Sequence, residues 1–256
     1  MRLPLSELPA AVQGLPVYGI ETRDLAPVGM PTEGLGVIAG PSGSGVSTAA
    51  LSCAEAFERW SRETGRRSRR VLLSFAPDGL ARRAAWRRSA IGGEAVAELG
   101  RELLLALGGN PGTSGRELGG RPGTSGTESG SEAEHAGGIA VGHRALIVVE
   151  RPGDAEGTAA LPHLVALAKA ARRARALVLF EFEPGTGGAI WDLYSALRQP
   201  TWGLALQPDE AESQSPFREP LGRVRRDEFP PGRGFAIEGG RLTPVQVALP
   251  SPVAAP

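Results

Sequence analysis

The chain has 256 residues, of which 41% are hydrophobic, so its length and composition suit one α/β domain with a sizeable core. Its 28 basic and 28 acidic residues balance to a formal charge of +0, which argues against a DNA-binding module with a broad positive surface. The sole cysteine, Cys53, excludes an internal disulfide and a cysteine-based zinc site, and no apolar run is long enough to span a membrane.

The first 34 residues are rich in proline and glycine, which interrupt any helical pattern. Their short apolar fragments are typical of edge strands or of an arm that wraps around a domain. We therefore interpret residues 1–34 as a lead-in and not as a domain. No signal peptide is visible in them, so we expect no export of this chain.

A glycine-rich stretch follows an apolar run at residues 35–39 and precedes a helical pattern that continues to about Arg62. Its spacing, Gly40, four residues, Gly45, one residue and Ser47-Thr48, is that of a phosphate-binding P-loop, in which backbone N–H groups and a helix N-terminus cradle an anion. A plain glycine-rich turn between strand and helix is the structural alternative. The candidate nucleotide-binding or vestigial pocket comprises Gly40, Pro41, Ser42, Gly43, Ser44, Gly45, Val46, Ser47 and Thr48.

The P-loop pattern is broken at one position. Val46 stands where the pattern requires a lysine, whose ammonium reaches the β- and γ-phosphates and stabilises charge during phosphoryl transfer. The backbone donors survive this substitution and the point charge does not. We therefore expect ATP to bind weakly if at all, and Mg²⁺ to bind only with ATP.

The rest of the chain alternates between strand and helix patterns, which predicts parallel βαβ units. Residues 108–138 differ in composition, being rich in Gly, Ser, Thr, Pro and Glu, and we expect a disordered loop there, inserted in the domain. The expected strands are 71–75, 145–150, 176–180 and 202–206, the expected helices are 94–107, 161–173 and 190–197, and a closing hairpin is expected from residues 235–237 and 245–249.

The buried strand at residues 145–150 ends in Glu150-Arg151. In a P-loop ATPase this position carries the acid that holds Mg²⁺, followed by an acid that positions water. Glu150 is the candidate for the first role, with a structural carboxylate at a strand end as the equal alternative. Arg151 replaces the second acid, which argues against water activation. The three histidines, His135, His143 and His163, share no metal-ligand spacing, so no metal site is expected.

Several segments, considered together, carry a resemblance to a known family: Gly19-Ile20 with Asp24 to Val28, the P-loop, Val148 to Glu150, Pro230-Pro231-Gly232-Arg233-Gly234, and Val245 to Ala248. They resemble the FtsK/SpoIIIE-type ATPase modules, in particular a degenerate terminal module of the actinobacterial type VII secretion motor. The resemblance implies a RecA-like α/β fold, with a mostly parallel central sheet flanked by helices and a C-terminal β-hairpin. The expected FtsK-type domain covers residues 35–250, with a tail at 251–256.

The resemblance also implies partners and a location. The partners would be other ATPase modules of the same motor or a ring of copies, and the export-signal peptide of a small helical secreted protein. The chain would lie in the cytoplasm at the inner face of the membrane, within a membrane-anchored complex but without direct membrane contact. Arg233 aligns with a position that could face a neighbouring module, although an arginine in a turn before the hairpin is the slightly preferred explanation.

The preferred interpretation is a degenerate, non-hydrolysing module that recognises a substrate or partner and regulates a motor. The alternative is a working FtsK-type translocase of protein or DNA, in which Glu150 holds Mg²⁺ and the missing charge comes from outside the domain. The neutral charge argues against DNA as a partner. An accessory protein of cell division or recombination on the same scaffold remains a third hypothesis, because a fold does not determine a function.

Overall fold

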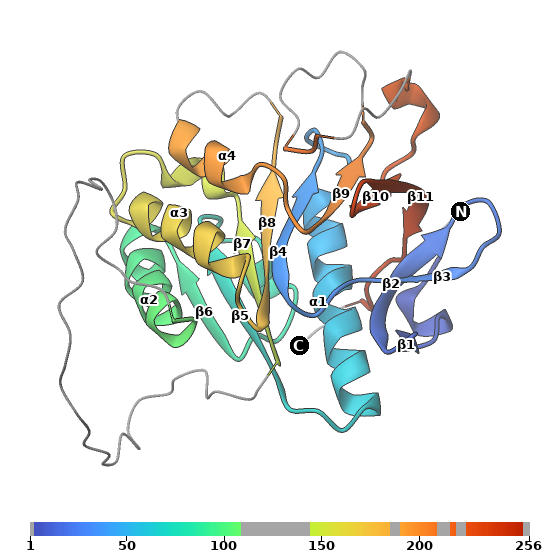
Figure 1. Cartoon of the computed structure of the whole chain (residues 1–256), viewed down its shortest axis with the longest axis horizontal. Helices are drawn as coiled ribbons and strands as arrows, with labels where there is room; N and C mark the ends of the chain where they lie inside the picture. The colour runs from blue at the N-terminus through green and yellow to red at the C-terminus, as the bar shows by residue number, and fades with distance from the viewer. Residues whose placement is uncertain (1–2, 109–143, 185–189, 209–215, 219–223, 253–256) are drawn as a thin grey trace, which may run out of the picture.

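The computed structural model describes residues 3–108, 144–184, 190–208, 216–218 and 224–252. Within them a single eleven-stranded sheet runs through the molecule (Figure 1). Its strand order is β1-β2-β11-β10-β9-β4-β8-β7-β5-β6, and β3 pairs with β2. The predicted insertion at 108–138 and the predicted tail at 251–256 lie largely outside the described residues.

Six neighbouring strands, from β9 to β6 in the sheet order, are mutually parallel. They are β4 (Gly34–Ala39), β5 (Ser68–Ser74), β6 (Arg88–Ile91), β7 (Arg144–Glu150), β8 (Ala176–Phe182) and β9 (Trp202–Leu206). The other half of the sheet is antiparallel and consists of β1 (Ala11–Val12), β2 (Leu15–Glu21), β3 (Pro27–Gly29), β10 (Arg233–Glu238) and β11 (Arg241–Val247).

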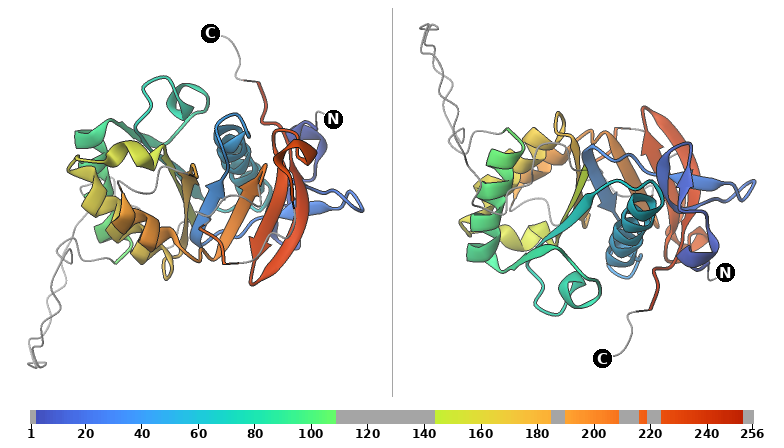
Figure 2. Two further views of the ribbon diagram at one scale, coloured as in Figure 1. Left: turned by 90° about the horizontal axis from the view of Figure 1, so that it is seen from above. Right: turned by 90° about the horizontal axis from the view of Figure 1, so that it is seen from below.

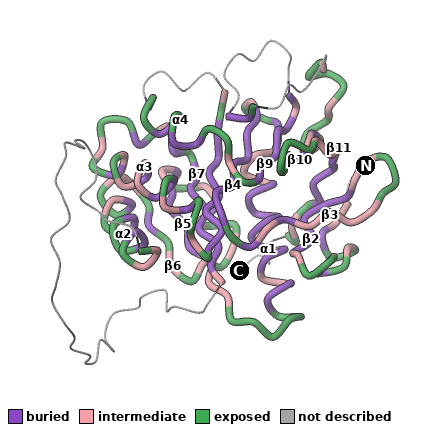
Figure 3. The backbone as a smooth tube through the Cα atoms, in the orientation of Figure 1, coloured by how far each residue is buried: buried purple, intermediate pink, exposed green. Residues whose placement is uncertain are grey.

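Helices cover both faces of the parallel half (Figure 2). Helix α1 (Val46–Glu63) packs on one face, and α2 (Gly93–Ala106), α3 (Ala160–Ala171) and α4 (Trp191–Leu197) pack on the other. Successive side chains of a strand point to opposite faces of the sheet. In β7, Leu146 and Val148 belong to the core beneath α1, whereas Ile147 and Val149 belong to the core beneath the other three helices. The central strands are therefore buried on both faces, as Figure 3 shows for β4 and β8.

The predicted fold class is confirmed: the fold is mixed α/β with a mostly parallel central sheet flanked by helices. The predicted hairpin is present as β10 and β11, paired in register from Arg233–Gln246 to Glu238–Arg241. Strand β6 was not predicted. It is a four-residue edge strand that begins in an arginine-rich stretch, so neither its length nor its composition distinguishes it from a loop.

The lead-in residues supply β1, β2 and β3, and β2 pairs with β11 of the hairpin. Leu5, Tyr18 and Met30 of this segment are fully buried in the core beneath α1. In the described part of the chain, none of the helices combines the length and the apolar character needed to cross a membrane.

Candidate functional site

The glycine-rich loop connects the carboxyl end of β4 to the N-terminus of α1. Gly43 and Gly45 have φ values of +81° and +96°, in the left-handed region that side chains disfavour. A Cβ on Gly40 would lie 2.5 Å from Ser44 Oγ and 2.8 Å from the carbonyl oxygen of Leu206. These glycines thus allow the tight turn that brings the chain from strand to helix.

The loop is tied to the hairpin through Gly232. The Gly232 amide donates to the Ser44 carbonyl at 2.8 Å, and the Val247 amide donates to the Gly232 carbonyl at 2.8 Å. The Pro-Pro-Gly-Arg-Gly segment is one of the segments on which the resemblance was based. These hydrogen bonds place it directly against the P-loop. Arg233 begins β10 and does not line the pocket described next, and its Nε is buried without a hydrogen-bond partner among the described residues.

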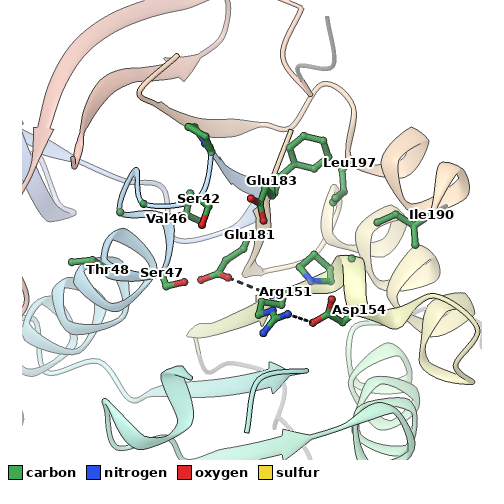
Figure 4. Close-up of a pocket in the computed structure, with 17 residues that line it drawn as sticks. Ser42, Val46, Ser47, Thr48, Arg151, Asp154, Glu181, Glu183, Ile190 and Leu197 are labelled. Carbon is green, nitrogen blue, oxygen red and sulfur yellow. Dashed lines mark hydrogen bonds and ion pairs between the residues drawn. The ribbon is translucent and has the colours of Figure 1, made fainter. Parts of the chain in front are cut away.

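A pocket of about 630 Å³ opens beside the loop (Figure 4), and we call it the P-loop pocket. The end of β7, the end of β8 and the region of α4 complete its walls. Of the nine predicted P-loop residues, all except Ser44 line it, together with Arg151–Asp154, Glu181–Glu183, Ile190 and Leu197.

Glu181 is the buried carboxylate of this pocket and is only 5% exposed. Its side chain points toward Ser47 of the P-loop (Figure 4). Glu181 Oε2 accepts the backbone amide of Arg151 at 3.3 Å, while Oε1 has no hydrogen-bond partner among the described residues. A buried anion with an unused oxygen is costly unless a cation or donor reaches it.

The pKa of Glu181 is raised from its ordinary value of 4.5 to about 7. Burial is the largest cause, because it disfavours the charged form, and the negative charge of Glu150 acts in the same direction. The Ser47 hydroxyl, the Arg151 amide and the Arg151 charge act in the opposite direction and do not compensate.

Glu150, the predicted Mg²⁺-holding acid, ends β7 next to Glu181 but does not line the P-loop pocket. It is 3% exposed, and its carboxylate accepts the Ser74 hydroxyl at 2.6 Å and the Leu80 amide at 3.0 and 3.1 Å. A Cβ on Gly79 would lie 2.2 Å from Glu150 Oε1. The chain before the short 3₁₀ helix η2 (Leu80–Arg82) thus closes over this carboxylate.

Arg151, at the position where the sequence analysis looked for a second acid, does line the pocket. Its guanidinium pairs with Asp154 at 2.7 Å (Figure 4), and its backbone is left-handed with a φ of 51°. Among the described lining residues the charged side chains are Arg151, Asp154, Glu181 and Glu183, so acidic groups outnumber the one cation. No three His, Cys, Asp or Glu side chains in the described residues are grouped as a metal site would need.

Sequence reasoning missed Glu181 because the predicted strand ended at residue 180, whereas β8 continues to Phe182. A usable signal was present in the sequence. The carboxyl ends of neighbouring parallel strands meet at one edge of a sheet, so an acidic residue ending the strand next to the P-loop strand belongs near the loop. Strands β4 and β8 are such neighbours, with Ile38 opposite Glu181.

The strand order around β4 and the glycine-rich loop at its end together define the fold of a P-loop ATPase domain. No protein-family model matches the chain, and no curated protein matches it significantly.

Among solved structures, the chain is similar to domains of type VII secretion ATPases. It matches the cytoplasmic domain of the type VII secretion ATPase EccC of Thermomonospora curvata with 18% identity and a TM-score of 0.66, covering 97% of this chain and 28% of that chain. It matches ATPases 2 and 3 of the same protein, in complex with a signal sequence peptide, with the same identity and TM-score, covering 97% and 43%. ATPases 2 and 3 of EssC from Geobacillus thermodenitrificans match with 18% identity and a TM-score of 0.64, covering 98% and 45%.

At these identities the likeness concerns the fold. The chain spans less than half the length of each of these three structures, which contain more than one such domain or further segments.

Proposed function

We propose that this chain is an FtsK-type module of a type VII secretion motor that does not hydrolyse ATP and that serves in recognition of a substrate or partner and in regulation of the motor. The observation that carries the proposal is the pairing of two features in one pocket. Val46 removes the cation that a triphosphate needs, and Glu181 adds a buried carboxylate beside Ser47.

The electrostatics of the pocket disfavour a nucleotide. The P-loop amides and the N-terminus of α1 attract an anion. Against them stand Glu181 and Glu183, and the Arg151 guanidinium is paired with Asp154. In a working site the hydroxyl at position 47 would bind Mg²⁺, and here it lies beside a carboxylate.

Hydrolysis would lack several contributions at once. Electrostatic groups aimed at developing charge are worth roughly 3–4 kcal/mol each, and the P-loop lysine and the second acid are both replaced. Glu150 could hold Mg²⁺ only after leaving Ser74 and Leu80, its present partners. These features favour a non-hydrolysing module over an active translocase.

The motor context is supported by the fold shared with the EccC and EssC domains, one of them in complex with a signal sequence peptide. We therefore propose other ATPase modules of such a motor, or further copies of this chain, as neighbours, with Arg233 as a neighbour-facing residue. An export-signal peptide is the proposed substrate. The proposed location is the inner face of the membrane, as part of a membrane-anchored complex.

Calorimetric titration with ATP, with and without Mg²⁺, tests the proposal. We expect no binding by the wild type up to millimolar nucleotide. Val46→Lys should gain weak binding, and Val46→Lys combined with Glu181→Gln should bind more tightly, because the new ammonium is then free to contact phosphate and no longer pairs with the carboxylate.

Micromolar, Mg²⁺-dependent binding by the wild type that is lost in Glu150→Gln would overturn the proposal and favour the active translocase. Glu156→Gln is the control, because it removes an exposed carboxylate that does not line the pocket and leaves Glu181 in place.

A further inference from the structure

We propose that the P-loop pocket binds the cationic side chain of a lysine or arginine presented by a protein segment, and that Glu181 is the group that recognises it. This inference rests on the proposed function, since it names the chemistry by which the module would recognise its partner.

The first argument is the unsatisfied charge of Glu181. The side chain is 5% exposed, points into the pocket and leaves Oε1 without a partner among the described residues. Removing a carboxylate from water costs several kcal/mol unless an opposite charge and hydrogen-bond donors replace the water. An ammonium or guanidinium supplies both.

The second argument is that Arg151, the cation nearest to Glu181 among the described lining residues, forms an ion pair with another carboxylate. Arg151 contacts Glu181 only through its backbone amide, while its guanidinium pairs with Asp154. Position 46 carries an isopropyl group where the P-loop pattern has an ammonium. The Arg151 charge acts on Glu181 from a distance, and no ammonium or guanidinium of the described lining residues forms an ion pair with it.

The third argument is the shape and polarity of the walls. Val46, Phe182, Ile190 and Leu197 line the same pocket, and apolar walls suit the methylene stem of a lysine or arginine whose charged end reaches a carboxylate. The P-loop amides can donate hydrogen bonds to backbone carbonyls of the segment that carries the cation. A divalent metal ion fits less well, because no three acidic or histidine side chains of the described residues are grouped to bind it.

The test uses N-acetyl-arginine methylamide as the probe, titrated into the ¹⁵N-labelled chain without nucleotide at about pH 8, where Glu181 is charged. N-acetyl-norleucine methylamide has a similar apolar stem without the charge and serves as the control ligand. We expect saturable shifts of the P-loop amides with the arginine probe. Binding should weaken at least about tenfold in Glu181→Gln, since a hydrogen bond to a charged group is stronger than one to a neutral group, and should change less than about twofold in Glu156→Gln, which removes an exposed carboxylate outside the pocket.

Val46→Lys gives a second test that keeps Glu181. The internal ammonium should pair with the carboxylate, lower the Glu181 pKa measured by carboxyl ¹³C shifts, and block the arginine probe. Unchanged binding of the arginine probe by Val46→Lys would contradict the assignment to Glu181, whether or not Glu181→Gln folds.

Four further results would overturn the inference: no saturable shift up to about 50 mM probe, equal binding by Glu181→Gln, equal binding of the norleucine probe, or the same Glu181-dependent shifts with Mg²⁺ alone. Failure of the arginine probe together with absent ATP binding would refute only this inference. Tight ATP binding would refute the proposed function whatever the probe does.

Discussion

Glu181 combines deep burial with a carboxylate oxygen that has no partner among the described residues, so its protonation is linked to folding. Its folded-state pKa of about 7 lies above the ordinary value of 4.5, which means that the folded state holds the proton more tightly than the unfolded chain. The stabilisation that the folded state gains by binding this proton is fully present below about pH 4.5. It is lost as the pH rises through about 7.

We therefore expect the wild type to lose on the order of 3 kcal/mol of unfolding free energy between about pH 5 and pH 8 through this group. Glu181→Gln should be close to wild type near pH 5 and more stable near pH 8, because the amide carries no charge to bury. Urea denaturation at both pH values measures this. Parallel pH dependence in the two proteins would contradict the prediction.

The Tyr18 hydroxyl is a second buried polar group. Its ring packs edge-on against Trp202, with ring centroids 5.4 Å apart, and its hydroxyl has no hydrogen-bond partner among the described residues. Tyr18→Phe keeps the ring and removes the hydroxyl, so we expect unchanged stability or a gain of up to about 1 kcal/mol. Thermal denaturation measures the effect, and a clear loss of stability would reveal a partner for the hydroxyl.

At the scale of elements, Glu150 joins the end of β7 to Ser74 at the end of β5 and to Leu80 in η2. Glu150→Ala should cost roughly 1–3 kcal/mol of unfolding free energy, because it leaves the buried Leu80 amide without an acceptor and the Ser74 hydroxyl with only the Ala76 carbonyl. Glu150→Gln retains one acceptor oxygen and should cost less. It should also lower the Glu181 pKa, because the charge of Glu150 raises it.

Denaturation combined with a carboxyl titration by NMR checks both effects. Near-native stability of Glu150→Ala would show that these hydrogen bonds contribute little. That result would leave Glu150 free to turn toward the P-loop pocket.

How much the sequence predicts depends on the strength of the local pattern in each element. The buried strands β4, β7 and β8 are continuous apolar runs, and the glycine spacing of the P-loop is a local signature, so these were predictable. Strand β6 is short and forms only by pairing with β5, which a local pattern does not encode. The role of Glu181 depends on β8 lying beside β4, a neighbourhood set by chain crossovers and not by the residues around Glu181.

At the scale of the whole molecule, the lead-in is part of the sheet and of the core. Strand β2 extends the sheet beyond β11, the Trp60 indole donates to the Gly14 carbonyl at 2.9 Å, and Leu5, Tyr18 and Met30 pack beneath α1. The parallel half of the sheet, which carries the P-loop, therefore depends on residues that precede it in the chain to complete its core.

We expect a chain lacking residues 1–34 to lose cooperative unfolding, because it exposes the buried face of α1 and the edge of β11. Leu25→Ala changes a 60% exposed side chain of the same segment and should shift stability by less than about 0.5 kcal/mol. Circular dichroism during heating distinguishes the two variants. A cooperative transition in the truncated chain would show that the remaining strands fold without the lead-in.

The hydrogen bonds at Gly232 have a consequence for how the P-loop keeps its shape. In many phosphate sites the ligand helps to order the loop, whereas here the backbone of Ser44 is fastened to a hairpin that is itself enclosed, with β9 on one side and β2 on the other. The sheet therefore fixes the backbone of the loop through these hydrogen bonds. A loop with valine at position 46 can keep the conformation of a phosphate cradle, since the scaffold and not a nucleotide maintains it, and its concave surface is then available for a different ligand.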